Sequence, residues 1–187
     1  MAIAPAARRL TADEYFALDL PERHIQLING EIVVTFAVLR HDRISLWIWR
    51  QLARWCESEA GDGEAGTAVA VHLDDRNVYG PDVWWVRHDR IPSRDATKIV
   101  GPTDLAVEVR SQSTWRYDLG TKKRVYEAAG LAELWLVDTK ADVVLAFRRS
   151  SAASPVFDVE LELAVGDTLT TPLLPELSID VADLFDR

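Results

Sequence analysis

Two acidic residues stand at the edge of one apolar run and inside another, and the second of these positions is hard to explain by packing alone. Asp82 stands directly before the apolar run 83–86, and Glu108 lies inside the apolar run 105–109. A buried carboxylate is costly unless it is paired, hydrogen-bonded or bound to a metal ion. If the two runs form neighbouring strands, both carboxylates could bind one cation together with the backbone carbonyl of Val109. Oxygen ligands of this kind favour Mg²⁺ or Mn²⁺.

A second interpretation fits the same two residues. Asp82 could cap a turn, and Glu108 could form a salt bridge with an arginine elsewhere in the chain. Carboxylates often play such structural roles when they are buried with a partner. The residue pattern alone therefore favours neither interpretation.

A lysine on the segment after Glu108 could complete a catalytic site. Lys122 and Tyr126 are four residues apart in a predicted helix over 118–129, so they share one face of that helix. If this face turns toward the strand end that carries Glu108, the ammonium group could orient a water or stabilise charge on a phosphate. Most helix lysines are simply solvated, so the spacing by itself assigns no role.

The elements that would position these residues begin with a helix and a hairpin. Thr11 and Glu14 have the spacing of a capping box, which predicts a short helix after Thr11. Asn29-Gly30 favours a tight turn, so we expect a β-hairpin between 24–28 and 31–36. Apolar residues at helical spacing then predict an amphipathic helix over 42–57. The glycine-rich stretch that follows, 61–66, is predicted to be a loop.

The rest of the chain reads as strands with one crossover helix. Several of the expected strands are almost continuously apolar, which suits a sheet that is covered on both faces. The predicted helix 118–129 ends at Gly130 and separates two of these strands, which implies a crossover unit that would be right-handed if the two strands are parallel. The expected strands are 67–73, 82–87, 104–110, 133–138 and two more after 143, followed by a turn at 165–167 and a short helix at 181–185.

Composition limits the class of protein. A chain of 187 residues with 48% hydrophobic content is expected to form one domain over 1–187. The single cysteine excludes a disulfide within the chain, and no run has the length of a signal peptide or membrane span, so we expect a cytoplasmic protein without a membrane partner. The net charge of −9 argues against a protein that coats DNA by bulk electrostatics, although a local basic stripe or a bound cation can still bring phosphate to an acidic protein.

Further candidates lie outside the acidic pair. His41, near the start of the helix 42–57, could contact phosphate or cap the helix. Arginines on one face of that helix could follow a DNA backbone, or they could simply be solvated. Trp115 lies beside the expected site and could contact substrate, and Trp47 and Trp49 are also expected at the surface. The arginines are Arg43, Arg50 and Arg54.

Taken in order along the chain, these motifs resemble the Uma-two family. The similarity extends from the predicted hairpin to the C-terminal region, so it does not depend on one short pattern. It rests on Ile28–Glu31, His41, Pro81-Asp82, Asp104–Thr114, Tyr117–Gly120, Lys122–Tyr126, Gly130, Glu133–Asp138 and Leu173–Leu177.

The resemblance implies a restriction-endonuclease-like protein of the PD-(D/E)XK nuclease superfamily. The fold implied is α/β, with a central mixed β-sheet flanked by helices and an N-terminal β-hairpin. Asp82 and Glu108 would be metal ligands, and Lys122 would be the catalytic lysine, moved from its usual strand onto the helix. Glu31 is similar to an acidic residue that often completes such sites.

One position departs from the superfamily pattern. The lysine usually stands two residues after the acidic ligand, and Arg110 occupies that place here. Arginine keeps its charge and does not act as a general base, but it binds phosphate well. We therefore expect Lys122 to take the lysine's role, with Arg110, His41 and Trp115 as possible substrate contacts.

The function expected from this resemblance is hydrolysis of phosphodiester bonds in DNA, or in another nucleic acid, by an endonuclease that depends on Mg²⁺ or Mn²⁺. The alternative is an inactive module of the same fold that binds nucleic acid or protein, because fold alone does not define function. A homodimer is expected for the active form, since cutting both strands often uses two sites.

Overall fold

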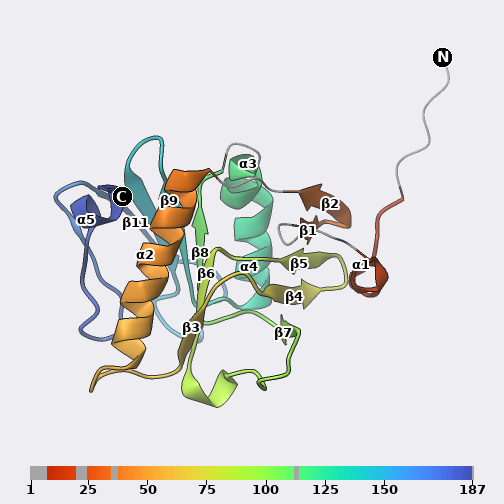
Figure 1. The fold of residues 1–187 in the computed structure, drawn as a ribbon, viewed down its shortest axis with the longest axis horizontal. Helices are drawn as coiled ribbons and strands as arrows, with labels where there is room; N and C mark the ends of the chain where they lie inside the picture. The colour runs from red at the N-terminus through yellow and green to blue at the C-terminus, as the bar shows by residue number, and fades with distance from the viewer. Residues whose placement is uncertain (1–7, 20–24, 35–37, 112–113, 187) are drawn as a thin grey trace.

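The computed structural model describes residues 8–19, 25–34, 38–111 and 114–186. Its centre is a six-stranded mixed sheet with the order β11-β10-β9-β8-β6-β3 (Figure 1). The strands β8 and β9 are parallel, whereas β6 runs antiparallel to β8. The strands of this sheet are β3 (Glu64–Gly66), β6 (Val83–Val86), β8 (Leu105–Val109), β9 (Glu133–Asp138), β10 (Val143–Arg148) and β11 (Val159–Ala164).

Two helices cover one face of the six-stranded sheet. The long helix α2 (Leu39–Cys56) and the short helix α5 (Val181–Phe185) lie on the same side in Figure 1. Ile44, Ile48 and Leu52 of α2 are fully buried in the cluster that also contains alternate residues of β6, β8 and β9. The 3.6-residue period of the helix and the two-residue period of the strands therefore meet in one core.

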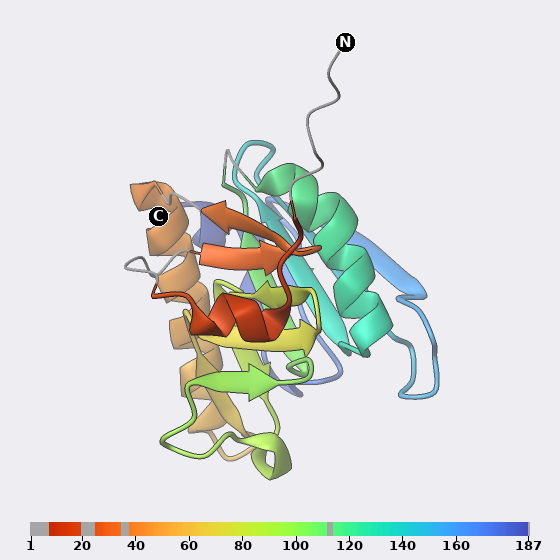
Figure 2. The same ribbon diagram turned by 90° about the vertical axis from the view of Figure 1, so that its right-hand side faces the viewer.

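A second, smaller sheet and the helix α4 (Lys123–Ala129) cover the opposite face. Figure 2 shows the smaller sheet between α2 and α4. Its strand order is β2-β1-β5-β4-β7, with β4 and β7 parallel. Its strands are β1 (Ile25–Ile28), β2 (Glu31–Val34), β4 (Ala70–Asp74), β5 (Asn77–Tyr79) and β7 (Lys98–Val100).

The N-terminal part agrees with its local signals. Helix α1 (Ala12–Ala17) begins after Thr11, and both hydrogen bonds of the predicted capping box with Glu14 are present. Asn29 and Gly30 have positive φ angles of 51° and 77°, as a tight hairpin turn requires. The hairpin over β1 and β2 is thus confirmed, and its expected outer ends at 24 and 35–36 lie outside the described residues.

The crossover between β8 and β9 is helical, as predicted, but it is not a uniform α-helix. It consists of α3 (Trp115–Tyr117), the π-helical turn η2 (Asp118–Lys122) and then α4. Gly130 ends α4 in the left-handed conformation, with a φ of 91°. A π-helical turn is rare and often occurs at functional sites. Its extra residue changes which side chains lie on one face of the helix.

Four expectations about the elements need correction. Residues 64–66, expected in a loop, form β3 beside β6. Gly66 suits this position because any side chain would collide with Trp84: a Cβ atom would lie 2.2 Å from Cζ2 of that ring. Strands β5 and β7 were not predicted, since three residues are too few to show alternation. Trp47, expected at the surface, is buried, and α2 begins three residues before the expected start at 42.

The remaining elements are short. The predicted turn around Gly166 and the predicted terminal helix are both present. Within the described part of the chain, no helix has both the length and the apolar character needed to cross a membrane. The short elements are η1 (His88–Arg90), β12 (Thr168–Leu169) and β13 (Ile179–Asp180).

Candidate active site

The register between β6 and β8 brings the two predicted acidic residues together. Val83 is opposite Val107, so continuing the register by one residue places Asp82 opposite Glu108. Oδ2 of Asp82 accepts a hydrogen bond of 2.7 Å from the backbone N–H of Val109. Two residues that are 26 positions apart in the chain therefore share one end of the central sheet.

Glu108 is buried and bonded to two residues of the crossover. Nζ of Lys122 lies 2.6 Å from Oε1 of Glu108, and the hydroxyl of Tyr126 donates a 2.8 Å hydrogen bond to the same oxygen. All three side chains are almost completely buried. The helix face shared by Lys122 and Tyr126 therefore does turn toward the strand that carries Glu108.

Asp118 is a member of this cluster that the sequence analysis did not single out. Its Oδ1 lies 3.1 Å from Nζ of Lys122, and its side chain is only 1% exposed. The signal that could have indicated Asp118 is its four-residue spacing from Lys122, which places an acid and a base on the same face of a helix.

The electrostatics of the cluster follow from burial. Loss of solvent raises the pKa of Glu108 to about 8; the Lys122 ammonium opposes this shift, and the charges of Asp118 and Asp82 add to it. Burial also raises the pKa of Asp118, while the pKa of Lys122 is raised because its two carboxylate neighbours outweigh its own desolvation. Two carboxylates thus contact one ammonium group, and the charge of Asp82 acts on the same group.

His41 contacts the cluster from the other side. Its Nε2 lies 3.1 Å from Oδ2 of Asp82, and its Nδ1 lies 3.3 Å from Oδ1 of Asp42. Burial works against the charged imidazole, but the hydrogen bonds and charges of Asp82 and Asp42 raise the pKa of His41 to about 9. His41 is therefore an imidazolium at neutral pH, placed between helix α2 and the end of β6.

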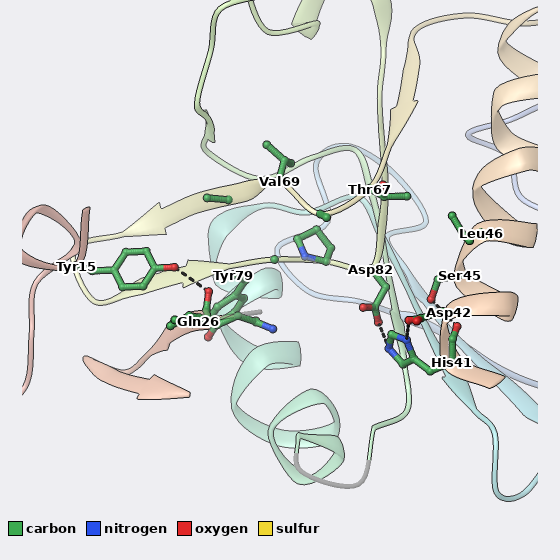
Figure 3. A pocket seen from close by; sticks show the side chains of 15 residues that line it. Tyr15, Gln26, His41, Asp42, Ser45, Leu46, Thr67, Val69, Tyr79 and Asp82 are labelled. Carbon is green, nitrogen blue, oxygen red and sulfur yellow. Dashed lines mark hydrogen bonds and ion pairs between the residues drawn. The ribbon is translucent and has the colours of Figure 1, made fainter. Parts of the chain in front are cut away.

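A cavity of about 650 Å³ opens beside Asp82 and His41 (Figure 3). Its walls come from β1, α2, the start of β4 and the segment between β5 and β6. Tyr79, Pro81 and Asp82 line it, whereas Glu108 and Lys122 do not. Of the acidic pair, Asp82 is thus the residue that lines the cavity, and Glu108 does not.

The oxygen atoms of the acidic pair suit a hard divalent cation. One oxygen of each carboxylate is held in place: Oδ2 of Asp82 by the Val109 N–H and His41, and Oε1 of Glu108 by Tyr126 and Lys122. No set of three or more acidic, histidine or cysteine side chains among the described residues has a metal-binding arrangement. A cation here would therefore complete its shell with backbone carbonyls and waters, as Mg²⁺ commonly does.

The structure does not bring the other predicted residues to the acidic pair. The Glu31 side chain is 57% exposed and lies 3.6 Å from Arg9, and among the described residues it makes no hydrogen bond or ion pair with the cluster. Arg110 is engaged with Asp138, with Nη1 at 2.8 and 2.7 Å from the two carboxylate oxygens. Its guanidinium also stacks over Trp115, 5.1 Å from the ring centroid.

A mixed sheet with helices on both faces, and with an acidic pair at the end of two neighbouring strands, is the architecture of restriction-endonuclease-like proteins. A family model described as "Uma2: Putative restriction endonuclease" matches residues 12–182, so the chain belongs to the Uma-two (Uma2) family.

Comparison with solved structures agrees on the fold. The crystal structure of a "putative nuclease belonging to DUF820" from Anabaena variabilis matches with a TM-score of 0.79. The two chains are 18% identical, and the match covers 95% of this chain and 98% of the other. A search of curated proteins finds no match. The predicted restriction-endonuclease-like fold is confirmed.

Proposed function

We propose that this chain is a divalent-metal-dependent endonuclease that hydrolyses phosphodiester bonds in DNA. The observation that carries the proposal is the juxtaposition of Asp82 and Glu108 at one end of the central sheet, each with one oxygen held in place, beside a cavity. Membership of a family described as restriction endonucleases supports the nuclease class.

Asp82, Glu108 and the backbone carbonyl of Val109 would hold Mg²⁺ or Mn²⁺. Bound there, the cation would supply Lewis-acid activation of a water molecule and neutralise charge on the phosphate. The N–H of Val109 and the hydroxyl of Tyr126 each fix one oxygen of the acidic pair, so these carboxylates need little rearrangement to bind. This preorganisation is what a catalytic electrostatic site requires.

Lys122 would act beside the same cation as a hydrogen-bond donor. Its ammonium group has three protons, and it contacts Glu108 at 2.6 Å and Asp118 at 3.1 Å. Its third proton, beyond these two contacts, would orient the attacking water or a phosphate oxygen. Asp118 would keep the side chain of Lys122 directed toward Glu108, as a positioning residue.

The remaining predicted residues receive other roles or none. His41 would hold Asp82 in place and offer positive charge to a phosphate at the mouth of the cavity. Arg110 would be a positioning residue, because its guanidinium is occupied by Asp138 and Trp115. Glu31 has no role in the proposed chemistry.

Nicking of supercoiled plasmid in the presence of Mg²⁺ or Mn²⁺ tests the proposal. The wild-type protein should nick the plasmid, and Asp82→Asn and Glu108→Gln should lose the activity. Glu31→Gln is the matched control, because it also removes a carboxylate charge but lies on the exposed strand β2. Equal nicking by all four proteins, or no nicking by any of them, would contradict the assignment.

One observation favours a second candidate function, an inactive module of the same fold that binds nucleic acid or protein. Lys122 and Glu108 are bonded to each other and are nearly inaccessible, which is also how a purely structural ion pair looks. Thermal unfolding with millimolar Mn²⁺ separates the two functions. If Mn²⁺ stabilises the wild-type protein but not Glu108→Gln, the nuclease is supported. If Mn²⁺ stabilises neither protein, or stabilises both equally, the module is supported.

We further propose that the chain is one domain that acts as a homodimer in the cytoplasm. The two faces of one central sheet contribute to the two largest core clusters, which supports a single cooperative unit. Two copies of the site would be needed to cut both strands of a duplex together. A sedimentation experiment that finds only monomers with full double-strand cleavage would argue against the dimer.

A further inference from the structure

The outer face of α2 carries arginines without acidic partners. We define the α2 stripe as Arg43, Leu46, Arg50 and Arg54, which follow one another at helical spacing and are all exposed. Among the described residues, none of the three arginines forms an ion pair or a side-chain hydrogen bond. Several arginines elsewhere in the fold do so: Arg87 and Arg90 pair with Asp104, and Arg110 pairs with Asp138.

The α2 stripe is continuous with the candidate active site. Leu46 lines the cavity that contains His41 and Asp82, and it also lines a shallow groove with Arg43, Trp49 and Arg50. Figure 3 shows Leu46 on α2 beside the cavity, on the same helix as His41. A molecule lying along the groove would therefore reach the acidic pair without leaving the surface of α2.

The charge of this helix differs from that of the whole protein. The chain has a net charge of −9, but α2 contains four arginines and one acidic residue, Asp42. A second copy of the chain docked through the same face would bring like charges together, which is unfavourable. A polyanion is the better complement, and guanidinium groups match the geometry of phosphate.

We propose that the α2 stripe binds the phosphate backbone of a DNA duplex and guides it to the acidic pair. The inference rests on the proposed nuclease function for the location of the cut, but the binding itself does not need catalysis. Arg43 and Arg54 are separated by eleven residues of helix, or about 16 Å. Counting both strands, a duplex carries a phosphate about every 1.7 Å of its axis, or roughly ten over that length, so each of the three arginines has a phosphate of one strand or the other within reach.

Fluorescence anisotropy with a labelled DNA duplex tests the inference. The wild-type protein is used in EDTA, so that binding is measured without cleavage, over a series of KCl concentrations. Arg43→Gln and Arg50→Gln should each weaken binding by about tenfold. Each should also make the slope of log K against log salt shallower by about 0.9, which corresponds to one lost phosphate contact. Arg94→Gln, at an exposed position between η1 and β7, is the matched control and should bind like wild type.

The outcomes distinguish this inference from the proposed function. If the stripe variants bind DNA with wild-type affinity and salt dependence, or if the wild-type protein does not bind DNA, the inference is wrong. A concentration-dependent dimer that dissociates when Arg43 and Arg50 are replaced would also overturn it, in favour of a second copy as occupant. If the stripe variants lose DNA binding while the wild-type protein nicks no plasmid with Mn²⁺, the inference stands and the nuclease proposal fails.

Discussion

Nζ of Lys122 lies 2.6 Å from Oε1 of Glu108, and the two side chains are 1% and 4% exposed. The contact joins the π-helical turn of the crossover to the central strand β8. A buried ion pair costs desolvation energy for both charges, so each partner stabilises the fold only while the other is present. The same pair therefore links the stability of the protein to its candidate chemistry.

Removal of the ammonium group should destabilise the protein strongly. Lys122→Met leaves Glu108 and Asp118 buried without a counter-charge, and we expect a loss of about 3–5 kcal/mol in the free energy of unfolding. The double variant Lys122→Met/Glu108→Gln should recover part of that loss, because one of the stranded charges is removed. Urea unfolding of the single and double variants measures the coupling. Lys140→Met, at an exposed turn, is the control; an equal effect of both single variants would contradict the ion-pair interpretation.

The contact between His41 and Asp82 should make stability depend on pH. The folded-state pKa of His41, about 9, is above its ordinary value of 6.5. The stabilisation is thus fully present below pH 6.5 and is lost as pH rises through about 9. We expect His41→Gln to be less stable than wild type by at most about 3 kcal/mol at the acidic end, with the difference shrinking across that window. Chemical unfolding in EDTA at several pH values measures this; a difference that grows with pH would have the wrong sign.

Arg110 should matter for structure more than for catalysis. Its bonds to Asp138 brace β8 against the end of β9, and both side chains are partly exposed. We expect Arg110→Ala to lower the free energy of unfolding by about 1 kcal/mol, as a partly screened charge-assisted bond would. Plasmid nicking by the folded variant should stay within about threefold of wild type, which is less than the tenfold change that 1.4 kcal/mol represents. A variant that loses nicking but keeps the wild-type free energy of unfolding would instead indicate that Arg110 contacts the phosphate.

Gly66 should be intolerant of a side chain. A Cβ atom there would lie 2.2 Å from Cζ2 of Trp84, in the pair of strands β3 and β6. We expect Gly66→Ala to destabilise the protein by about 1–3 kcal/mol, the usual cost of overpacking a core. Gly120→Ala, which meets no atom within 4 Å, is the control. Thermal unfolding should find the control neutral or slightly stabilised, and an equal loss in both variants would remove the steric explanation.

Local signals in the sequence were sufficient for many elements. The capping box at Thr11, the Asn29-Gly30 turn and the glycine that ends α4 each depend on residues within a few positions, and all three are present. Short strands were missed for the same physical reason. A strand of three residues, such as β5, is too short to show the alternation of apolar and polar residues by which strands are recognised in a sequence.

The sequence and the tertiary structure each supplied part of the candidate site. The sequence by itself determined that Asp82 and Glu108 are carboxylates attached to apolar strands, and that Lys122 shares a helix face with Tyr126. Only the tertiary structure decided that the register of β6 and β8 sets the two carboxylates opposite each other, that Asp118 joins Lys122, and that Glu31 lies outside the cluster. Periodicity reports which face of an element is buried, but strand register and helix docking arise from packing between segments far apart in the chain.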